Sequence, residues 1–287
     1  MTTLEPIAIH PTRSVSASSM AALRALIARD LLVVKKSFGE FVARTVVQPF
    51  LLCFVFLFVF PKIGQSIGGG TSASAQSSFA TILVPAVVGL SILFQGVQSV
   101  ALQMSQEFGF TREIEDRVQA PCPIWLVAMA RVFSGAAQGL ISAIIVLPIA
   151  SVIHAPGVQA HFSFHWVIIV TLVPLASITM ASLGLVLGTT FEPRNIGLMF
   201  GFIILPVTFL GGTYYLWESL APITIQGVPW LQILVLINPL IYVNEGMRAA
   251  FTLAPHMHLY VVYPVLLAFM AGFLALGLRN FKRRVVS

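Results

Sequence analysis

Charged residues are scarce in this sequence, and their scarcity indicates its class. Asp, Glu, Lys and Arg make up 9% of the 287 residues, whereas soluble domains carry about 25%. Hydrophobic residues account for 57% of the chain, and the mean hydropathy is +0.94. This composition excludes an ordinary soluble domain and predicts an integral membrane protein.

Cysteines and familiar catalytic motifs are also scarce. The two cysteines, Cys53 and Cys122, cannot build a disulfide framework, and we expect both to be free thiols. The sequence contains no Gly-x-x-x-x-Gly-Lys-Ser/Thr phosphate loop and no His-Glu-x-x-His zinc motif. We therefore expect no catalytic residue, no metal site and no bound cofactor on this chain. Five histidines fall near the predicted outer face, at spacings that match no standard metal site: His154, His161, His165, His256 and His258.

The apolar residues gather into continuous runs close to the roughly 20 residues that a helix needs to cross a bilayer. A β-barrel would instead show segments of about ten residues that alternate in polarity, unlike the run PFLLCFVFLFVF. We predict an all-α membrane protein. Its six transmembrane helices are expected at 41–60, 79–102, 124–153, 164–187, 196–210 and 259–278.

Basic residues favour the cytoplasmic side of a membrane, and their distribution predicts the orientation. With six spans and the N-terminus inside, only Lys62 and Arg248 of the sixteen Lys and Arg residues fall outside. The C-terminus and its basic tail, 279–287, are then cytoplasmic. The net charge of +6 follows from this topology, so we expect no nucleic-acid partner.

The N-terminal region has two predicted parts. Residues 1–19 form a disordered tail, and residues 20–40 form an amphipathic helix that lies in the inner interface. Asp30 interrupts the apolar face of this helix, and a simple extension of the first span is the alternative. The apolar face is made by Leu23, Leu26, Ile27, Leu31 and Val34.

The segment before the last span is apolar but interrupted. It contains Asn238, Pro239, Glu245 and Arg248, and burying a charge costs roughly 2.5 to 3.5 kcal/mol on insertion scales. We expect residues 211–251 to enter the outer leaflet and return, and a seventh span is the alternative. Glu245 and Arg248 are expected to pair at the surface.

The residues of this segment resemble the C-terminal signature of type-2 ABC exporter permeases. The resemblance covers most of the chain, although Phe110 separates a Gly-Thr pair that the family keeps together. The residues that carry it are Arg29-Asp30-Leu31 before the first span, Gln48-Pro49 at its start, and Asn238, Pro239, Leu240, Tyr242 and Arg248.

The family resemblance gives the loop 103–123 a role. In such permeases this loop docks on the ATPase. The charges ahead of Pro121 and Pro123 suit a short helical lever, whereas a passive solvated loop is the alternative. The coupling residues expected are Glu107, Thr111, Arg112, Glu113, Glu115 and Asp116.

Two further sets of residues follow. The re-entrant segment is predicted to form an outer gate from Gly211, Gly212, Asn238, Pro239, Leu240, Tyr242 and Arg248. The candidate pathway is made of neutral polar residues in the spans, Gln95, Gln98, Ser99, Gln138, Ser142 and Thr208. Interhelical hydrogen bonding is the simpler role for any one of these pathway residues.

The resemblance implies the membrane subunit of an ATP-driven exporter in the cell's inner membrane. Two ATPase subunits would hold ATP and Mg²⁺, and a second permease subunit, identical or related, would complete the path. Spans without charge away from their ends favour an apolar or amphipathic cargo, such as a drug, lipid or glycolipid. The alternatives are a polysaccharide exporter, a non-transporting membrane scaffold or an ATP-independent carrier.

Overall fold

The computed structural model describes residues 15–63, 72–109, 123–158 and 160–286. Within these ranges the chain is helical and contains no β-strand, apart from one isolated bridge between Ile225 and Val228. The predicted all-α class is therefore confirmed. Residues 1–14 of the predicted tail, the segments 64–71 and 110–122, and residues 159 and 287 lie outside the described residues. The part of the tail that is described, from Val15, is helical.

Five helices in the described part of the chain are long and apolar enough to cross a membrane: Phe38–Lys62, Ser74–Gly109, Ile124–Val152, Trp166–Thr190 and Leu259–Val285. They correspond to α2 (Phe38–Cys53) with its continuation through α3 (Phe60–Lys62), α4 (Ala73–Gly109), α6 (Ile124–Val152), α7 (Trp166–Thr190) and α12 (Leu259–Val286). The predicted span at 196–210 is also helical, but it is the shorter segment Ile196–Phe209.

The shorter segment and the first span share a local distortion. The segment consists of α8 (Ile196–Met199), a π-helical stretch Phe200–Ile204 and α9 (Leu205–Phe209). A second π-helical stretch, Phe54–Val59, interrupts the first span. Each stretch ends shortly before a proline, Pro206 or Pro61. Proline lacks the N–H of the helical ladder and collides with the carbonyl four residues earlier, so a wider turn there relieves the clash.

Small residues let the helices around α4 approach closely. A Cβ at Gly184 of α7 would lie 2.9 Å from the Val97 carbonyl oxygen of α4, and one at Gly188 would lie 2.9 Å from the Ala101 Cα. In membranes, where water does not drive helices together, such close approach supplies the packing energy. Accordingly, 72% of the apolar window of α4 is buried, compared with 22% for the first span and 17% for α12.

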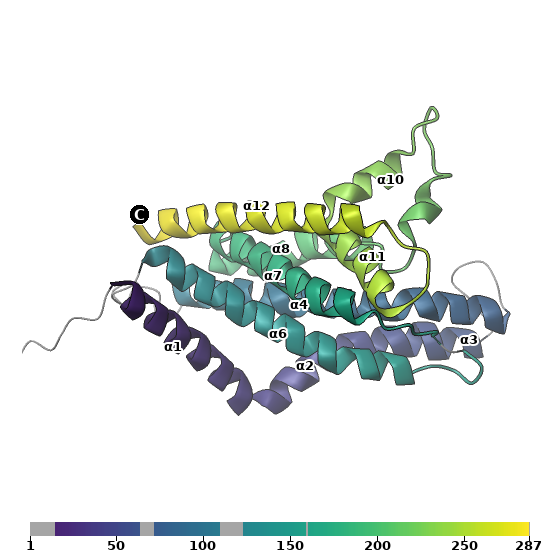
Figure 1. The fold of residues 1–287 in the computed structure, drawn as a ribbon, viewed down its shortest axis with the longest axis horizontal. Coiled ribbons are helices and arrows are strands. Elements are labelled where there is room, and N and C mark those ends of the chain that lie inside the picture. The colour runs from purple at the N-terminus through teal and green to yellow at the C-terminus, as the bar shows by residue number, and fades with distance from the viewer. Residues whose placement is uncertain (1–14, 64–71, 110–122, 159, 287) are drawn as a thin grey trace, which may run out of the picture.

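The helix directions follow from contacts at both ends. Thr171 and Tyr263, near the starts of α7 and α12, share a hydrogen bond of 2.5 Å. Near their ends, Asn280 donates to Thr190 at 3.1 Å and Arg284 to the Phe191 carbonyl at 3.0 Å. The two helices therefore run in the same direction, and the chain between them returns to the end from which α7 starts. Figure 1 shows the start of α1 and the C-terminus at one end of the bundle.

The first helix, α1 (Val15–Lys36), breaks from α2 at Ser37 and meets it in a sharp bend (Figure 1). It is not a simple extension of the first span. The face predicted to be apolar is half-buried against the bundle, and Leu26 packs beside α6 and α12 in a small core cluster. The helix starts five residues before the predicted boundary at residue 20.

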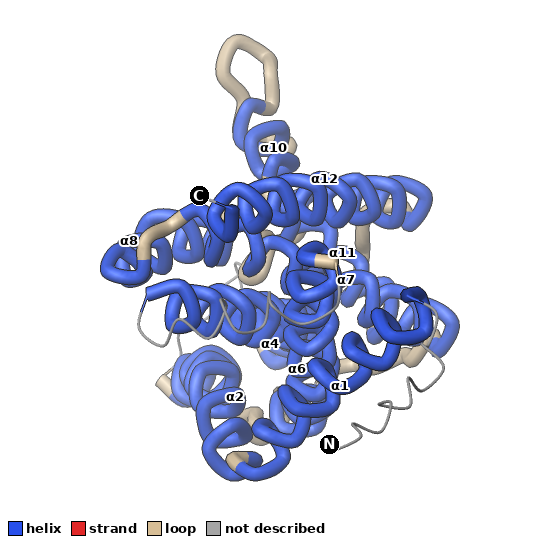
Figure 2. The backbone as a smooth tube through the Cα atoms, turned by 90° about the vertical axis from the view of Figure 1, so that its left-hand side faces the viewer, coloured by secondary structure: helices blue, strands red, loops and turns tan. Residues whose placement is uncertain are grey.

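The segment after α9 folds against the opposite end. It contains short 3₁₀ turns at Trp217–Leu220 and Val235–Ile237, α10 (Trp230–Leu234) and α11 (Pro239–Phe251). Figures 1 and 2 show α10 and its connecting turn projecting from the bundle beside α12, whereas α11 lies among the long helices. All residues of α11 are buried.

Candidate functional site

Asn238 fixes the start of α11. Its Oδ1 accepts a hydrogen bond from the Leu240 N–H at 2.9 Å, and Pro239 occupies the first helical position, where no N–H is needed. The Asn238 Nδ2 donates to the Val207 carbonyl at 2.7 Å. The Asn-Pro pair therefore caps one helix and ties it to the end of α9.

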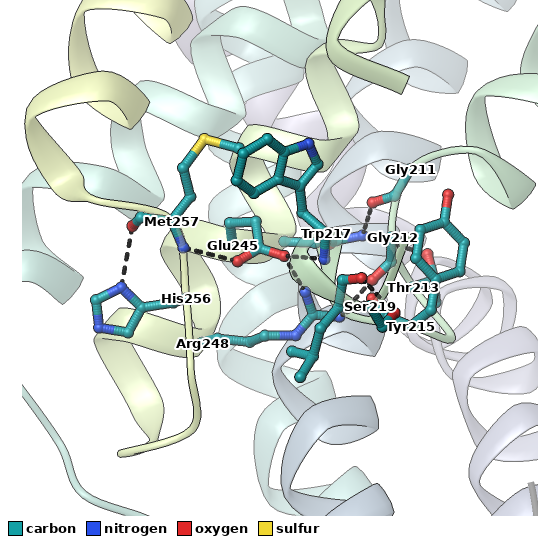
Figure 3. Close-up of polar contacts among 12 residues, drawn as sticks. Gly211, Gly212, Thr213, Tyr215, Trp217, Ser219, Glu245, Arg248, His256 and Met257 are labelled. Carbon is teal, nitrogen blue, oxygen red and sulfur yellow. Dashed lines mark hydrogen bonds and ion pairs between the residues drawn. The ribbon is translucent and has the colours of Figure 1, made fainter. Parts of the chain in front are cut away.

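A buried ion pair lies about two turns further along α11 (Figure 3). Arg248 Nη1 donates to Glu245 Oε1 at 2.7 Å, and the side chains are 0% and 2% exposed. Glu245 also accepts hydrogen bonds from the Trp217 N–H at 3.1 Å and the Met257 N–H at 2.9 Å. The predicted pairing is confirmed, but its predicted surface location is wrong, because backbone groups from two distant turns surround the carboxylate.

Arg248 also holds the turn that follows α9. It donates to the carbonyl oxygens of Gly212 and, at 3.0 Å, Tyr215. Asn244 donates to the Gly211 carbonyl at 2.7 Å. Gly212 has φ +68°, a left-handed conformation suited to glycine. Polar side chains of α11 thus hold this turn through its backbone carbonyls.

The remaining gate residues surround the same turn. A Cβ on Gly211 would collide with the Leu240 side chain, and the Tyr242 hydroxyl donates to the Leu236 carbonyl at 3.0 Å. Burial raises the pKa of Tyr214 and Tyr215, so both phenols stay neutral. The structure brings all seven predicted gate residues to α11 or to the segments that touch it.

A second buried arginine lies near the opposite end of the bundle. Arg131, in α6, donates to Asp30 of α1 at 2.7 Å and to Gln103 of α4 at 2.9 Å, and it forms an ion pair with Glu107 of α4. Arg131 is 4% exposed, and both carboxylate side chains are 7% exposed. We call Asp30, Glu107 and Arg131 the inner cluster.

The inner cluster was not predicted. Asp30 looked like an interruption of an apolar face, and Arg131 like one of many inner cations. The signal was present, since an acidic residue on an apolar helix face and a basic residue inside a predicted span each require a buried partner. The sequence suggested spans without charge away from their ends. Arg131, buried within α6, shows that this prediction was wrong.

The predicted coupling residues are only partly described. Thr111, Arg112, Glu113, Glu115 and Asp116 lie outside the described residues. Glu107 is buried and faces Arg131 within the same chain. Its side chain ties the end of α4 to the start of α6, the two helices that flank this loop.

Three of the six candidate pathway residues, Gln95, Gln98 and Ser142, lie at or beside one cavity. Gln95 donates to Thr45 at 2.6 Å, and together with Gln98 it lines a cavity of about 150 Å³ between α2 and α4. Ser142 of α6 lies 3.5 Å from Ser91, which also lines this cavity.

The other three pathway residues lie elsewhere. Ser99 faces Gly135 of α6, and Thr208 donates to the Ile204 carbonyl beside the gate at 2.8 Å. Gln138 is buried in α6. The six residues thus do not form one continuous polar path within this subunit.

The described residues show no group of three or more His, Cys, Asp or Glu placed to hold a metal ion. Cys53 is a buried free thiol, and Cys122 lies outside the described residues. Residues 64–68, Gly-Gln-Ser-Ile-Gly, fit the Gly-x-Ser-x-Gly pattern of hydrolases. That pattern has meaning on a turn between a strand and a helix, whereas these residues follow a membrane helix.

Comparison with known proteins agrees with this architecture. The model of the family described as "ABC-2 type transporter" matches residues 21–252. The chain belongs to the ABC-2 type transporter family. Two relatives, from Escherichia coli strain K12 and Shigella flexneri, are each named inner membrane transport permease YadH. Each is 29% identical over 236 residues, which cover 80% of this chain and 84% of the relative.

Membership of the ABC-2 family makes the chain a permease, the membrane subunit of a transporter, and its apolar helices make it a multi-pass membrane protein. The family match includes α1 from Ala21 onward, the inner cluster, residues 110–122 and all of α11. Both buried ion-pair sites thus lie inside the part of the chain that is shared with the family.

Proposed function

We propose that this ABC-2 permease works as the membrane half of an ATP-driven exporter in the inner membrane. Two permease subunits form the path, and two separate ATPase subunits bind ATP and Mg²⁺. The cargo is an apolar or amphipathic molecule such as a drug, lipid or glycolipid. The observation that carries the proposal is the family match over residues 21–252, and the relatives' names support the location.

Six crossings, with both termini in the cytoplasm, fit the arrangement of the helices. Because α7 and α12 run in the same direction, the chain between them must return across the bundle, and Ile196–Phe209 is the helical part of that return. Its three pieces of four, five and five residues rise about 21 Å. The turn and α11 that follow occupy the rest of the outer half.

Thiol labelling tests this topology. In a background without native cysteines, single cysteines replacing Ser74, His161 and Gln226 should react with an impermeant reagent added to sealed cells. Cysteines replacing Glu115 and Lys282 should react only after the membrane is opened. Labelling of Lys282→Cys in sealed cells would contradict the six-span topology.

The coupling role of the loop 103–123 remains a proposal, supported by the inner cluster at its base. A lever moved by an ATPase is effective only when both of its ends are firmly joined to the bundle. Glu107 at the end of α4 and Arg131 in α6 provide this junction and attach α1 to it. Movement of the loop would then reach α1, α4 and α6 together.

Copurification tests the function as a whole. An ATPase subunit encoded beside this permease should copurify with it, and its ATP hydrolysis should increase in the complex. The double variant Arg112→Ala/Glu113→Ala should fold normally and lose most of this stimulation. A permease that folds, binds no ATPase and still moves cargo would instead support an ATP-independent carrier.

The outer-gate role is also a proposal. It is supported by the buried polar contacts through which α11 holds the turn Gly211–Tyr215. A disulfide from Ile237→Cys, which lies just before α11 and is 73% exposed, to a cysteine on α9 of the paired subunit should block release of cargo, and reductant should restore it. Unchanged export with the crosslink complete would show that this segment does not gate.

A further inference from the structure

The cavity between α2 and α4 is lined by six polar residues and by Pro49, Leu90 and Phe94. Arg44, Thr45 and Gln48 contribute from α2, and Ser91, Gln95 and Gln98 contribute from α4. Its volume of about 150 Å³ is below the 300 Å³ or so at which pockets begin to enclose a whole drug-sized ligand. The cavity therefore suits a small polar group whose apolar remainder stays outside.

Gln95 is a buried polar residue of this cavity, and its amide oxygen lacks a hydrogen-bond donor among the described residues. The residue is 3% exposed, and its Nε2 donates to the Thr45 hydroxyl at 2.6 Å. Thr45 in turn donates to the Phe41 carbonyl at 2.7 Å, so its proton is already used. The Gln95 Oε1 has no hydrogen-bond partner in the described structure. A buried acceptor without a donor is costly. Gln95 lines the cavity, so a small rotation of its amide would let an O–H or N–H group in the cavity satisfy this oxygen.

Arg44 lies where the cavity opens to the protein surface. Its side chain is exposed, and it belongs to none of the ion pairs among the described residues. A guanidinium on a membrane helix binds phosphate or carboxylate with two parallel hydrogen bonds. The lining thus combines a cation that belongs to no described ion pair with a buried acceptor that has no donor in the described part of the chain.

The surface of α2 beyond the cavity is apolar. Val47, Leu51 and Phe54 follow Arg44 at helical spacing and are 55%, 52% and 37% exposed. They continue toward the middle of the span, whereas Arg44 lies near its start. A polar group bound at Arg44 would therefore place attached acyl chains along this stripe, in the direction of an inner-leaflet lipid.

We propose that this cavity binds the headgroup of an anionic, hydroxyl-bearing amphipathic cargo, such as a phosphate diester that carries a glycerol or a sugar. Arg44 binds the anionic oxygens, and Gln95 Oε1 accepts from a headgroup hydroxyl. This inference deepens the proposed function and rests on it, since it names the chemical class of the exported molecule. Gln48 and Gln98 contribute further polar contacts at the sides.

Binding is tested with three lipids of matched acyl chains. Phosphatidylglycerol has the anion and the hydroxyls, phosphatidylmethanol has the anion alone, and phosphatidylcholine has neither a net charge nor a donor. Native mass spectrometry of the purified full-length permease measures how much of each lipid stays bound. We expect retention to fall in that order, and equal retention of the three lipids would overturn the proposal.

Single substitutions test separately the contact of Arg44 with the anion and the contact of Gln95 with the hydroxyl. Arg44→Gln should weaken phosphatidylglycerol and phosphatidylmethanol alike, roughly tenfold, as expected for loss of a hydrogen bond to a charged group. Gln95→Leu should weaken phosphatidylglycerol about threefold and leave phosphatidylmethanol unchanged. Lys36→Gln is the matched control, because it removes an exposed cation that does not line the cavity. Wild-type binding by Arg44→Gln would overturn the proposal. If Gln95→Leu unfolds, Gln95→Met replaces it, because methionine keeps the unbranched shape and removes the amide acceptor.

A competition experiment distinguishes a lipid site from a site for soluble phosphate esters, and a transport assay distinguishes exported cargo from a structural lipid. Soluble glycerol phosphate that displaces the lipid completely, at equal affinity, would show a site for free phosphate esters and overturn the lipid assignment. These binding measurements need no ATPase, so they stand even if ATP-driven export fails. If lipid binding follows the expected order but Arg44→Gln exports cargo normally, the bound lipid is structural, and the cavity's role in cargo selection is wrong.

Discussion

The two buried arginines of this permease solve the same electrostatic problem in different ways. Arg248 pairs with Glu245 three residues away on the same helix, and its other bonds go to backbone carbonyls of one turn. Arg131 contacts side chains from two other helices, and Asp30 is 101 residues distant in sequence. The Arg248 site joins α11 to backbone groups of neighbouring turns, whereas the inner cluster joins side chains of three helices.

This difference indicates which site can move. Opening the Arg248 site would leave several buried backbone groups and two buried charges without partners at once, so we expect it to stay intact through a transport cycle. Side-chain partners on α1, α4 and α6 can separate while each helix remains folded. A conformational signal from the ATPase is therefore more easily carried by the inner cluster, and the Arg248 site supplies rigidity to the outer closure.

The largest expected effect comes from breaking the Arg248 site. Arg248→Met leaves the Glu245 carboxylate buried without its cation and leaves two backbone carbonyls without a donor. Breaking one partner of a buried pair costs about 3 to 5 kcal/mol. We expect a large loss of monodisperse protein in detergent and a lower unfolding temperature, measured by size-exclusion fluorescence on heating.

The control for this variant is already present in the chain. Arg194 and Glu192 form an exposed pair at 2.7 Å, with side chains 81% and 57% exposed. Arg194→Met should therefore change stability by less than about 1 kcal/mol. The double variant Glu245→Gln/Arg248→Met should recover part of the loss, since no uncompensated charge remains. An Arg248→Met protein as stable as the wild type would contradict the proposed rigidity.

A smaller, localised effect is expected at the inner cluster. Arg131→Met leaves Asp30 and Glu107 without their shared cation, but α1 can swing away and expose both carboxylates to water. We expect α1 amides to exchange hydrogen much faster, while α7 amides exchange as in the wild type, because local opening is the cheapest response. Hydrogen exchange with mass spectrometry measures this pattern. Equal acceleration in α1 and α7 would show that the cluster supports the whole bundle.

Much of the helical framework could be predicted because hydropathy reports contact with lipid. The limits of the helices could not, because a helix does not end where the hydrocarbon ends. The span predicted at 79–102 belongs to Ala73–Gly109, and that at 259–278 belongs to Leu259–Val286. In each case polar or charged residues extend the helix beyond the apolar run, where backbone hydrogen bonds alone continue it.

The candidate site was less predictable for a different reason. Asn238 and Pro239 have a local signature, so the start of α11 could be expected from sequence. The burial of Glu245 could not, because its partners are N–H groups of Trp217 and Met257 on separate turns. Tertiary partners of this kind leave no periodic pattern in one sequence, and the same holds for Asp30 and Arg131.

The smallest expected effect sharpens the comparison most directly. Asp30→Asn removes one carboxylate from the inner cluster, but Arg131 keeps Glu107, and the new amide oxygen can still accept from Arg131. Glu245→Gln removes the partner carboxylate of Arg248 and leaves that cation buried. We therefore expect Asp30→Asn to change stability by less than about 1 kcal/mol, and Glu245→Gln to cost about 3 kcal/mol or more. Thermal unfolding of the two variants, measured side by side, checks the order. If Asp30→Asn proves as damaging as Glu245→Gln, Arg131 requires both carboxylates at once, and the inner cluster is as rigid as the outer site.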